Sequence, residues 1–162
     1  MKHAQNDDPD CGKIRVFVYG SLKRGQPNGI ILRNCVHARC MGLESITGKF
    51  AMLSLGTFPG VFTQSLECPD ITIFGELWVG DEEMLHALDI LEGHPNFFER
   101  RKVVGNQAGK RMWVYLLPPH WEKEAEDVVE YSCWRTSNRE FDHWGKTAVG
   151  PVFGFKEKKN SA

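Results

Sequence analysis

The sequence predicts an α+β protein in which a curved sheet, mixed or antiparallel, is flanked by helices. Three observations predict this class. An apolar run at 16–19 is typical of a buried strand, and one clear amphipathic helix follows Asp81. Two further strand-like segments, 97–104 and 111–117, are separated only by a glycine-containing turn. Strands that outnumber helices in this way favour a sheet with helices packed outside it.

Composition indicates one globular domain that binds a small molecule or another protein. The chain has 162 residues, of which 41% are hydrophobic and 25% charged, with a net charge of −1. This near-neutral balance argues against nucleic acid or an anionic membrane as the partner. We expect a polar lead-in at 1–12, a single domain at 13–155 and a disordered tail at 156–162. A monomer is the favoured oligomeric state.

Cysteine usage and the N-terminal residues indicate a cytoplasmic protein. The five cysteines are odd in number and form no C-x-x-C pair, which favours reduced thiols. The first residues lack the apolar centre of a signal peptide, and no apolar run is long enough to span a membrane. We therefore expect a cytoplasmic location.

The segment 14–28 is interpreted as an inner strand that runs into a glycine-rich loop. Its apolar run has no alternation, as expected of a strand covered on both faces, and it stops at Gly20. A short helix through 30–32 is expected, with Asn28 as its N-cap. Lys23 and Arg24 are interpreted as a solvated pair. The loop is either an ordinary tight turn or a place where backbone N–H groups approach a ligand.

The middle of the chain predicts short strands followed by the one clear helix. Residues 42–63 are interpreted as strands and turns, and 71–79 as a strand in which Gly75 marks a bulge or a close approach. In the helix, Asp81 is the expected cap and Gly93 the expected terminator. Its apolar stripe is predicted to comprise Met84, Leu85, Leu88 and Leu91.

The C-terminal third is expected to begin with a hairpin. The segments 97–104 and 111–117 are interpreted as its strands, with the turn at 105–109. Beyond it, a short helix around 122–130 is expected, and Trp134 and Trp144 are expected to pack on the core.

Glu92 is the strongest candidate for a chemical role. At about 100° per residue it projects between Leu85 and Leu88, on the apolar side of its helix. It also lies at the helix C-terminus, where the dipole disfavours negative charge. Both effects raise a carboxyl pKa, as is useful in a general acid/base. The structural alternative is a frayed helix end at which Glu92 reaches solvent or an arginine.

Several common sites are not indicated. The spacing of Gly20 and Gly25 resembles the start of a P-loop, but Gln26 and Pro27 replace the required Lys and Ser/Thr, and G-x-G-x-x-G is absent. The six histidines have no metal-ligand spacing. Ser21 is not in a G-x-S-x-G elbow. We therefore expect neither a metal nor another cofactor.

Three motifs together resemble the gamma-glutamylcyclotransferase-like (AIG2-like) superfamily, and within it the gamma-glutamylamine cyclotransferases most closely. They are V-F-V-Y-G-S-L-K-R-G-Q-P-N at 16–28, G-E-L-W-V at 75–79 and L-D-I-L-E-G-H-P-N-F-F-E-R at 88–100. Their order and spacing match the family over about 14–117, roughly two-thirds of the chain. The segment after Pro118 matches poorly.

The resemblance implies a small barrel-like sheet flanked by helices, with a cavity for a gamma-glutamyl group. By matching position, Glu92 would be the catalytic acid/base. The substrate site would be lined by Tyr19, Gly20, Ser21 and Leu22, with Phe98 and Tyr115 as further candidates. Phe98 stands where many relatives carry Tyr, so a hydroxyl contact would be lost while the ring remains. Tyr115 is also interpretable as a packed strand residue.

The implied reaction is attack of the substrate's α-amine on its γ-carbonyl, which releases 5-oxoproline and a free amine. The expected substrate is gamma-glutamyl-epsilon-lysine, with glutathione or a simple gamma-glutamyl amino acid second. The reaction requires no metal, nucleotide or covalent intermediate. Two alternatives stay open. One is a non-catalytic binding or regulatory module with the same cavity, and the other is a scaffold protein in which Glu92 forms a structural salt bridge.

Overall fold

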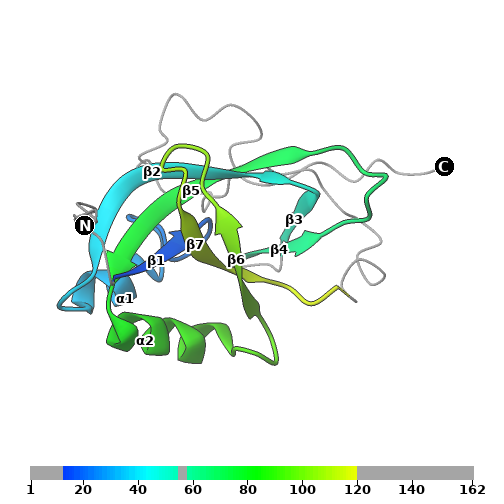
Figure 1. Ribbon diagram of the computed structural model, residues 1–162. Coiled ribbons are helices and arrows are strands. Elements are labelled where there is room, and N and C mark those ends of the chain that lie inside the picture. The colour runs from blue at the N-terminus through cyan, green and yellow to red at the C-terminus, as the bar shows by residue number, and fades with distance from the viewer. Residues whose placement is uncertain (1–12, 55–57, 120–162) are drawn as a thin grey trace, which may run out of the picture.

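The computed structural model describes residues 13–54 and 58–119. These residues form two helices and seven strands (Figure 1): β1 (Ile14–Val18), α1 (Gly29–Asn34), β2 (Arg39–Gly48), β3 (Phe50–Ser54), β4 (Pro59–Thr63), β5 (Ile71–Gly80), α2 (Glu82–Glu92), β6 (Glu99–Val104) and β7 (Arg111–Leu116). The expected elements at 1–12 and 122–130, the tail 156–162, and Trp134 and Trp144 lie outside the described residues. None of the described helices is long and apolar enough to cross a bilayer.

The main sheet is mixed, as predicted, and its strand order is β2-β5-β1-β7-β6. β1 pairs with β5 in antiparallel and with β7 in parallel, while β2 with β5 and β6 with β7 are antiparallel. In Figure 1, β2 and β5 curve together along their length. In the described part β2 and β6 end the strand order, so this sheet does not close into a barrel. The separate β3–β4 pair packs against it.

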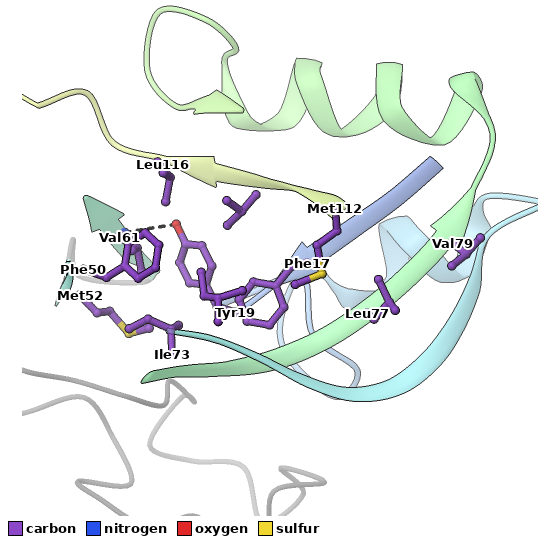
Figure 2. Close-up of a cluster of buried hydrophobic side chains, with 12 residues drawn as sticks. Phe17, Tyr19, Phe50, Met52, Val61, Ile73, Leu77, Val79, Met112 and Leu116 are labelled. Carbon is purple, nitrogen blue, oxygen red and sulfur yellow. Dashed lines mark hydrogen bonds between the residues drawn. The ribbon is translucent and has the colours of Figure 1, made fainter. Parts of the chain in front are cut away.

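Buried side chains alternate along β1 between two apolar clusters. Phe17 and Tyr19 belong to the first cluster, which extends along the main sheet and includes Phe50, Met52 and Val61 of the β3–β4 pair (Figure 2). Val16 and Val18 belong to the second, together with residues of both helices such as Leu32 and Leu88. A strand covered on both faces reads as a continuous apolar run. The prediction of an inner strand at 14–19 is confirmed, with its last paired residue at Val18.

Helix α2 begins and ends where the sequence predicts. The side chain of Asp81 accepts a hydrogen bond from the backbone N–H of Met84 at 3.0 Å, and Gly93 ends the helix with φ of 63°. A positive φ is the conformation for which glycine is favoured at a helix C-terminus. The apolar stripe is shorter than predicted. Met84 and Leu88 are buried, but Leu91 is 39% exposed.

The predicted hairpin is also present, and a buried carboxylate holds its turn. Glu44 on β2 is 1% exposed and accepts hydrogen bonds from the backbone N–H groups of Gln107 and Ala108 at 2.8 and 2.9 Å. A carboxylate that accepts several N–H bonds compensates for its own burial. This contact ties the β6–β7 turn to a strand more than sixty residues earlier in the chain.

Two smaller expectations are refined by the structure. Gly75 is a close approach: a Cβ there would collide with the carbonyl oxygen of Val18. The register irregularity on β2–β5 lies at Cys40 and Gly42, on the partner strand. Asn28 does precede α1, but its side chain donates to the Ser21 hydroxyl at 3.0 Å and makes no capping hydrogen bond.

Candidate active site

A pocket lies where the end of β1, the following loop, the end of α2 and the start of β4 meet β7. The empty space between its walls is about 350 Å³, part of it open to solvent. All seven side chains and loop residues named from the sequence line this pocket: Tyr19, Gly20, Ser21, Leu22, Glu92, Phe98 and Tyr115. Four further lining residues were not foreseen: Phe17, Val18, Phe58 and Pro59. Only the fold could reveal these, since apolar residues carry no chemical signal in the sequence.

Glu92 is the carboxylate of the pocket, and its surroundings raise its pKa. Burial raises the pKa of Glu92 to about 7 from an ordinary value of 4.5. Among the described residues, no cation forms an ion pair with Glu92. The scaffold alternative, which required an arginine or lysine against this carboxylate and no cavity, therefore finds no support in the described part. The carboxyl group can gain and lose a proton near neutral pH.

The loop after β1 lines the same pocket with Gly20, Ser21 and Leu22. Its carbonyls are used internally: Gly20 O accepts from Lys23 N at 3.1 Å, and Ser21 O accepts from Asn28 N at 2.8 Å. In the described part, no group accepts a hydrogen bond from the N–H of Gly20, Ser21 or Leu22. Such donors can bind a carboxylate or a developing oxyanion.

A buried carboxylate on β5 holds this loop in place. Glu76 is fully buried; its Oε1 accepts from the backbone N–H of Arg24 at 2.6 Å, and its Oε2 accepts from Arg24 Nε at 2.7 Å. The Cys40 thiol donates to the same carboxylate at 3.3 Å. The sequence places Glu76 in a strand motif but does not reveal this partner, which lies fifty-two residues away.

The interpretation of Lys23 and Arg24 as a solvated pair is wrong for Lys23 and holds only in part for Arg24. Lys23 is fully buried, and the side chain of Arg24 is 47% exposed but bound to Glu76. Within the described residues Arg24 stays half exposed because only its backbone N–H and Nε are used, as partners of the buried Glu76 carboxylate.

Two tyrosines form rigid walls of the pocket, and one of their hydroxyls is fully used by the fold. The Tyr19 hydroxyl donates to the Tyr115 carbonyl at 2.7 Å and accepts from Val61 N at 3.2 Å, the contact drawn in Figure 2. Burial, and then the charge of Glu92, raises the pKa of Tyr19 well above its usual range. Tyr19 therefore presents a neutral aromatic ring to a ligand.

Tyr115 is bound by its hydroxyl to helix α2. The hydroxyl donates to Asp89 Oδ1 at 2.7 Å. Burial, and then this hydrogen bond, raises the pKa of Tyr115 well above its usual range. Tyr115 is therefore a packed strand residue, as one interpretation of the sequence predicted, and it also lines the pocket, as the other predicted.

The remaining wall is aromatic. The rings of Phe58 and Phe98 lie 6.3 Å apart, and Phe97, which is 42% exposed, packs edge-on against Phe98 at 5.1 Å. Phe98 is 3% exposed and offers a ring without a hydroxyl. The pocket lining thus combines polar groups, from Glu92 and the 20–22 loop, with the apolar rings of Phe58 and Phe98.

The described residues do not suggest metal or thiol chemistry. No three His, Cys, Asp or Glu side chains within 13–54 and 58–119 are placed to hold a metal ion. Burial raises the pKa of Cys40 to about 11, so the thiol nearest the loop anchor stays protonated at neutral pH.

Comparison with known proteins identifies the same fold and family. A family model described as "Gamma-glutamyl cyclotransferase, AIG2-like" matches residues 16–136. A Drosophila melanogaster protein provisionally named a gamma-glutamylcyclotransferase is 32% identical over 133 residues, which cover 79% of this chain and 85% of that protein. The gamma-glutamylaminecyclotransferase of Bos taurus is 31% identical over 124 residues, which cover 70% and 74% of the two chains.

A solved structure extends the fold comparison. The crystal structure of an AIG2-like protein from Mus musculus superimposes with a TM-score of 0.62 at 23% identity. The superposition covers 91% of this chain and 99% of the mouse chain. At this identity the likeness establishes a common fold.

Proposed function

The chain belongs to the AIG2-like gamma-glutamyl cyclotransferase family, and from this premise we propose that it is a gamma-glutamylamine cyclotransferase. It closes the gamma-glutamyl group of its substrate to 5-oxoproline and releases the amine. One observation carries the proposal: a carboxyl group with a pKa of about 7 faces a pocket that is also lined by the Gly20–Leu22 loop. We place this activity in the cytoplasm, in keeping with the cysteine usage.

In the proposed mechanism Glu92 moves one proton between two nitrogens of the substrate. The ionised carboxylate removes a proton from the α-amine as that nitrogen attacks the γ-carbonyl carbon. The protonated Glu92 then returns the proton to the leaving nitrogen as its bond to carbon breaks. The lactam keeps the other amine hydrogen, so atoms and charge balance.

The loop and the aromatic wall supply binding and orientation. The N–H groups of Gly20, Ser21 and Leu22 bind the substrate carboxylate or the oxyanion that forms at the carbonyl. The pocket folds the substrate so that amine and carbonyl approach to about 3–3.5 Å. The rings of Phe58 and Phe98 accept an apolar leaving group, which fits the methylene chain of a lysine released from gamma-glutamyl-epsilon-lysine.

The test is incubation with a panel of gamma-glutamyl compounds, with 5-oxoproline and the free amine both quantified. We expect gamma-glutamyl-epsilon-lysine to be turned over fastest, and glutathione or gamma-glutamyl amino acids more slowly. The matched control is gamma-glutamyl-epsilon-lysine acetylated on the glutamyl α-amine, which lacks the nucleophile and should be inert. Absence of 5-oxoproline from every compound would contradict the proposal.

A second candidate is a non-catalytic binding module on the same fold. Phe98 favours it, because that position offers no hydroxyl to a substrate. This candidate predicts that gamma-glutamyl compounds raise the melting temperature without forming product.

The activity should depend on the protonation of Glu92. We expect kcat/KM to rise as the pH increases through about 7, because the general base is the ionised form and its pKa in the free enzyme is about 7. The substrate amine, whose ordinary pKa is about 8, adds a second rise at higher pH. NMR titration of the Glu92 carboxyl in the free protein separates the two. A flat profile between about pH 5.5 and 7.5 would contradict the assignment.

Gly20 should tolerate no side chain. A Cβ at this position would lie 2.6 Å from Pro59 Cγ, and the proline ring cannot turn aside. We expect Gly20→Ala to displace the loop from Pro59, to cost about 1–3 kcal/mol of unfolding free energy and to raise KM. The control is Gly109→Ala, which is strained by its positive φ of 65° yet has open space around it, and lies in the distant β6–β7 turn. The Gly109→Ala variant should be less stable than the wild-type protein but should have the same KM.

A further inference from the structure

Asp89 lies one helical turn before Glu92 and joins α2 to two strands. Its Oδ1 accepts hydrogen bonds from Arg100 Nε on β6 at 2.8 Å and from the Tyr115 hydroxyl on β7 at 2.7 Å. Burial alone would raise the pKa of Asp89, but the bonds from Arg100 and Tyr115 and the charges of Arg100 and His94 outweigh it and hold the pKa low. Asp89 is therefore an ionised acceptor at neutral pH.

The last turn of α2 has little apolar anchoring of its own. Leu88 is its last buried side chain, whereas Ile90 is 68% and Leu91 39% exposed. A helix end held by few apolar contacts frays readily unless polar contacts hold it. The two charge-assisted hydrogen bonds at Asp89 lie in this weakly packed turn, which also carries Glu92.

Tyr115 continues the connection to Tyr19 and to the loop that follows it. Its hydroxyl is bound to Asp89, while its carbonyl accepts the hydrogen bond of the Tyr19 hydroxyl. Tyr19 in turn accepts from Val61 N on β4 and immediately precedes the Gly20–Leu22 loop. One chain of hydrogen bonds thus joins the helix that carries Glu92 to the strand that carries the loop.

We infer that Asp89 is a positioning residue, which acts through Tyr115 and Arg100 to hold Glu92 at a set distance from the substrate loop. The inference rests on the proposed function for its catalytic consequence. Proton transfer requires the carboxyl group within hydrogen-bond reach of the substrate nitrogen, and a misplacement of about 1 Å can cost about a hundredfold in rate. Asp89 itself is not among the residues that line the pocket.

The kinetic test uses Asp89→Ala, Tyr115→Phe and the double variant. Each single variant is expected to lower kcat by about tenfold to a hundredfold while KM changes less than about threefold, because substrate binding by the loop is retained. The kcat of the double variant should be no lower than that of the less active single variant, since the two substitutions break the same connection. The control is Arg101→Gln, which removes an exposed ion pair with Glu99 on the same strand and should leave kcat unchanged. Unchanged kcat in both single variants would overturn the inference.

A second measurement decides the inference without any turnover. Tyr115→Phe removes a hydroxyl and no charge, because Tyr115 is neutral at the pH values concerned. If this contact holds Glu92 in place, its loss admits water and lowers the Glu92 pKa from about 7 toward 4.5, as read by NMR titration. An unshifted Glu92 pKa in a folded Tyr115→Phe protein would refute the positioning role. If the wild-type protein forms no 5-oxoproline but Tyr115→Phe still lowers the Glu92 pKa, only the proposed function is refuted and the positioning role stands.

Discussion

Glu92→Gln should reduce 5-oxoproline formation by about a hundredfold to ten-thousandfold while the protein still binds its substrate. The amide has nearly the shape of the carboxyl group but can neither take the proton of the α-amine nor deliver one to the leaving nitrogen. Turnover is measured as 5-oxoproline, and binding by calorimetry or by substrate-dependent thermal stabilisation. The control is Glu82→Gln, at the exposed start of the same helix, which should keep full turnover. Unchanged activity in Glu92→Gln would contradict the assignment of the acid/base.

The same substitution should stabilise the protein at alkaline pH. Because the folded-state pKa of Glu92 is raised from 4.5 to about 7, the native state holds a proton between these values that the unfolded state has released. The stability of the wild-type protein therefore falls as the pH rises through this window, by about 3 kcal/mol in total. Glutamine has no such ionisation. Urea unfolding at about pH 5 and pH 8 should show a steeper loss for wild type than for Glu92→Gln.

Glu76→Ala is expected to lower both stability and activity. It removes two charge-assisted hydrogen bonds to Arg24, each worth about 1.5–3 kcal/mol, and leaves the Arg24 N–H without its acceptor. We expect a loss of about 3 kcal/mol or more in unfolding free energy. We also expect a raised KM, because the loop that carries Gly20 to Leu22 is no longer held against β5.

The matched control for this variant is Lys49→Ala. It removes an ion pair with Asp70 at 2.9 Å whose side chains are 34% and 58% exposed. Exposed pairs contribute about 1 kcal/mol or less. Equal effects of the two substitutions on stability and KM would show that Glu76 does not anchor the loop.

Local patterns predicted the elements that depend on local interactions. The run at 16–19, the cap at Asp81, the terminator Gly93 and the β6–β7 hairpin were all predictable, since each is specified by residues close in sequence. Glu92 could be singled out because it broke the apolar pattern of its own helix. The structure adds that burial is what raises its pKa.

What could not be predicted depends on partners distant in sequence. Periodicity does not tell which strand lies beside β1, so neither the parallel β1–β7 pair nor the Arg24–Glu76 contact was foreseeable. Leu91 was misassigned because an apolar stripe on a helix does not reveal which of its residues the neighbouring elements cover. The hydrogen bonds of Asp89 were not foreseeable for a related reason: its two partners come from strands that follow the helix.

The parallel pairing of β1 with β7 determines when the pocket can exist during synthesis. Val16 pairs with Trp113 and Phe17 with Val114, so the two strands that flank the pocket are among the most distant in the chain. Pairings of such large sequence separation form late, because the intervening chain must first be closed into a loop. A chain synthesised only as far as the residues before β7 has both the Gly20–Leu22 loop and Glu92, but lacks Tyr115, which β7 contributes to the pocket. Ligand recognition should therefore appear only once the seventh strand has left the ribosome and docked.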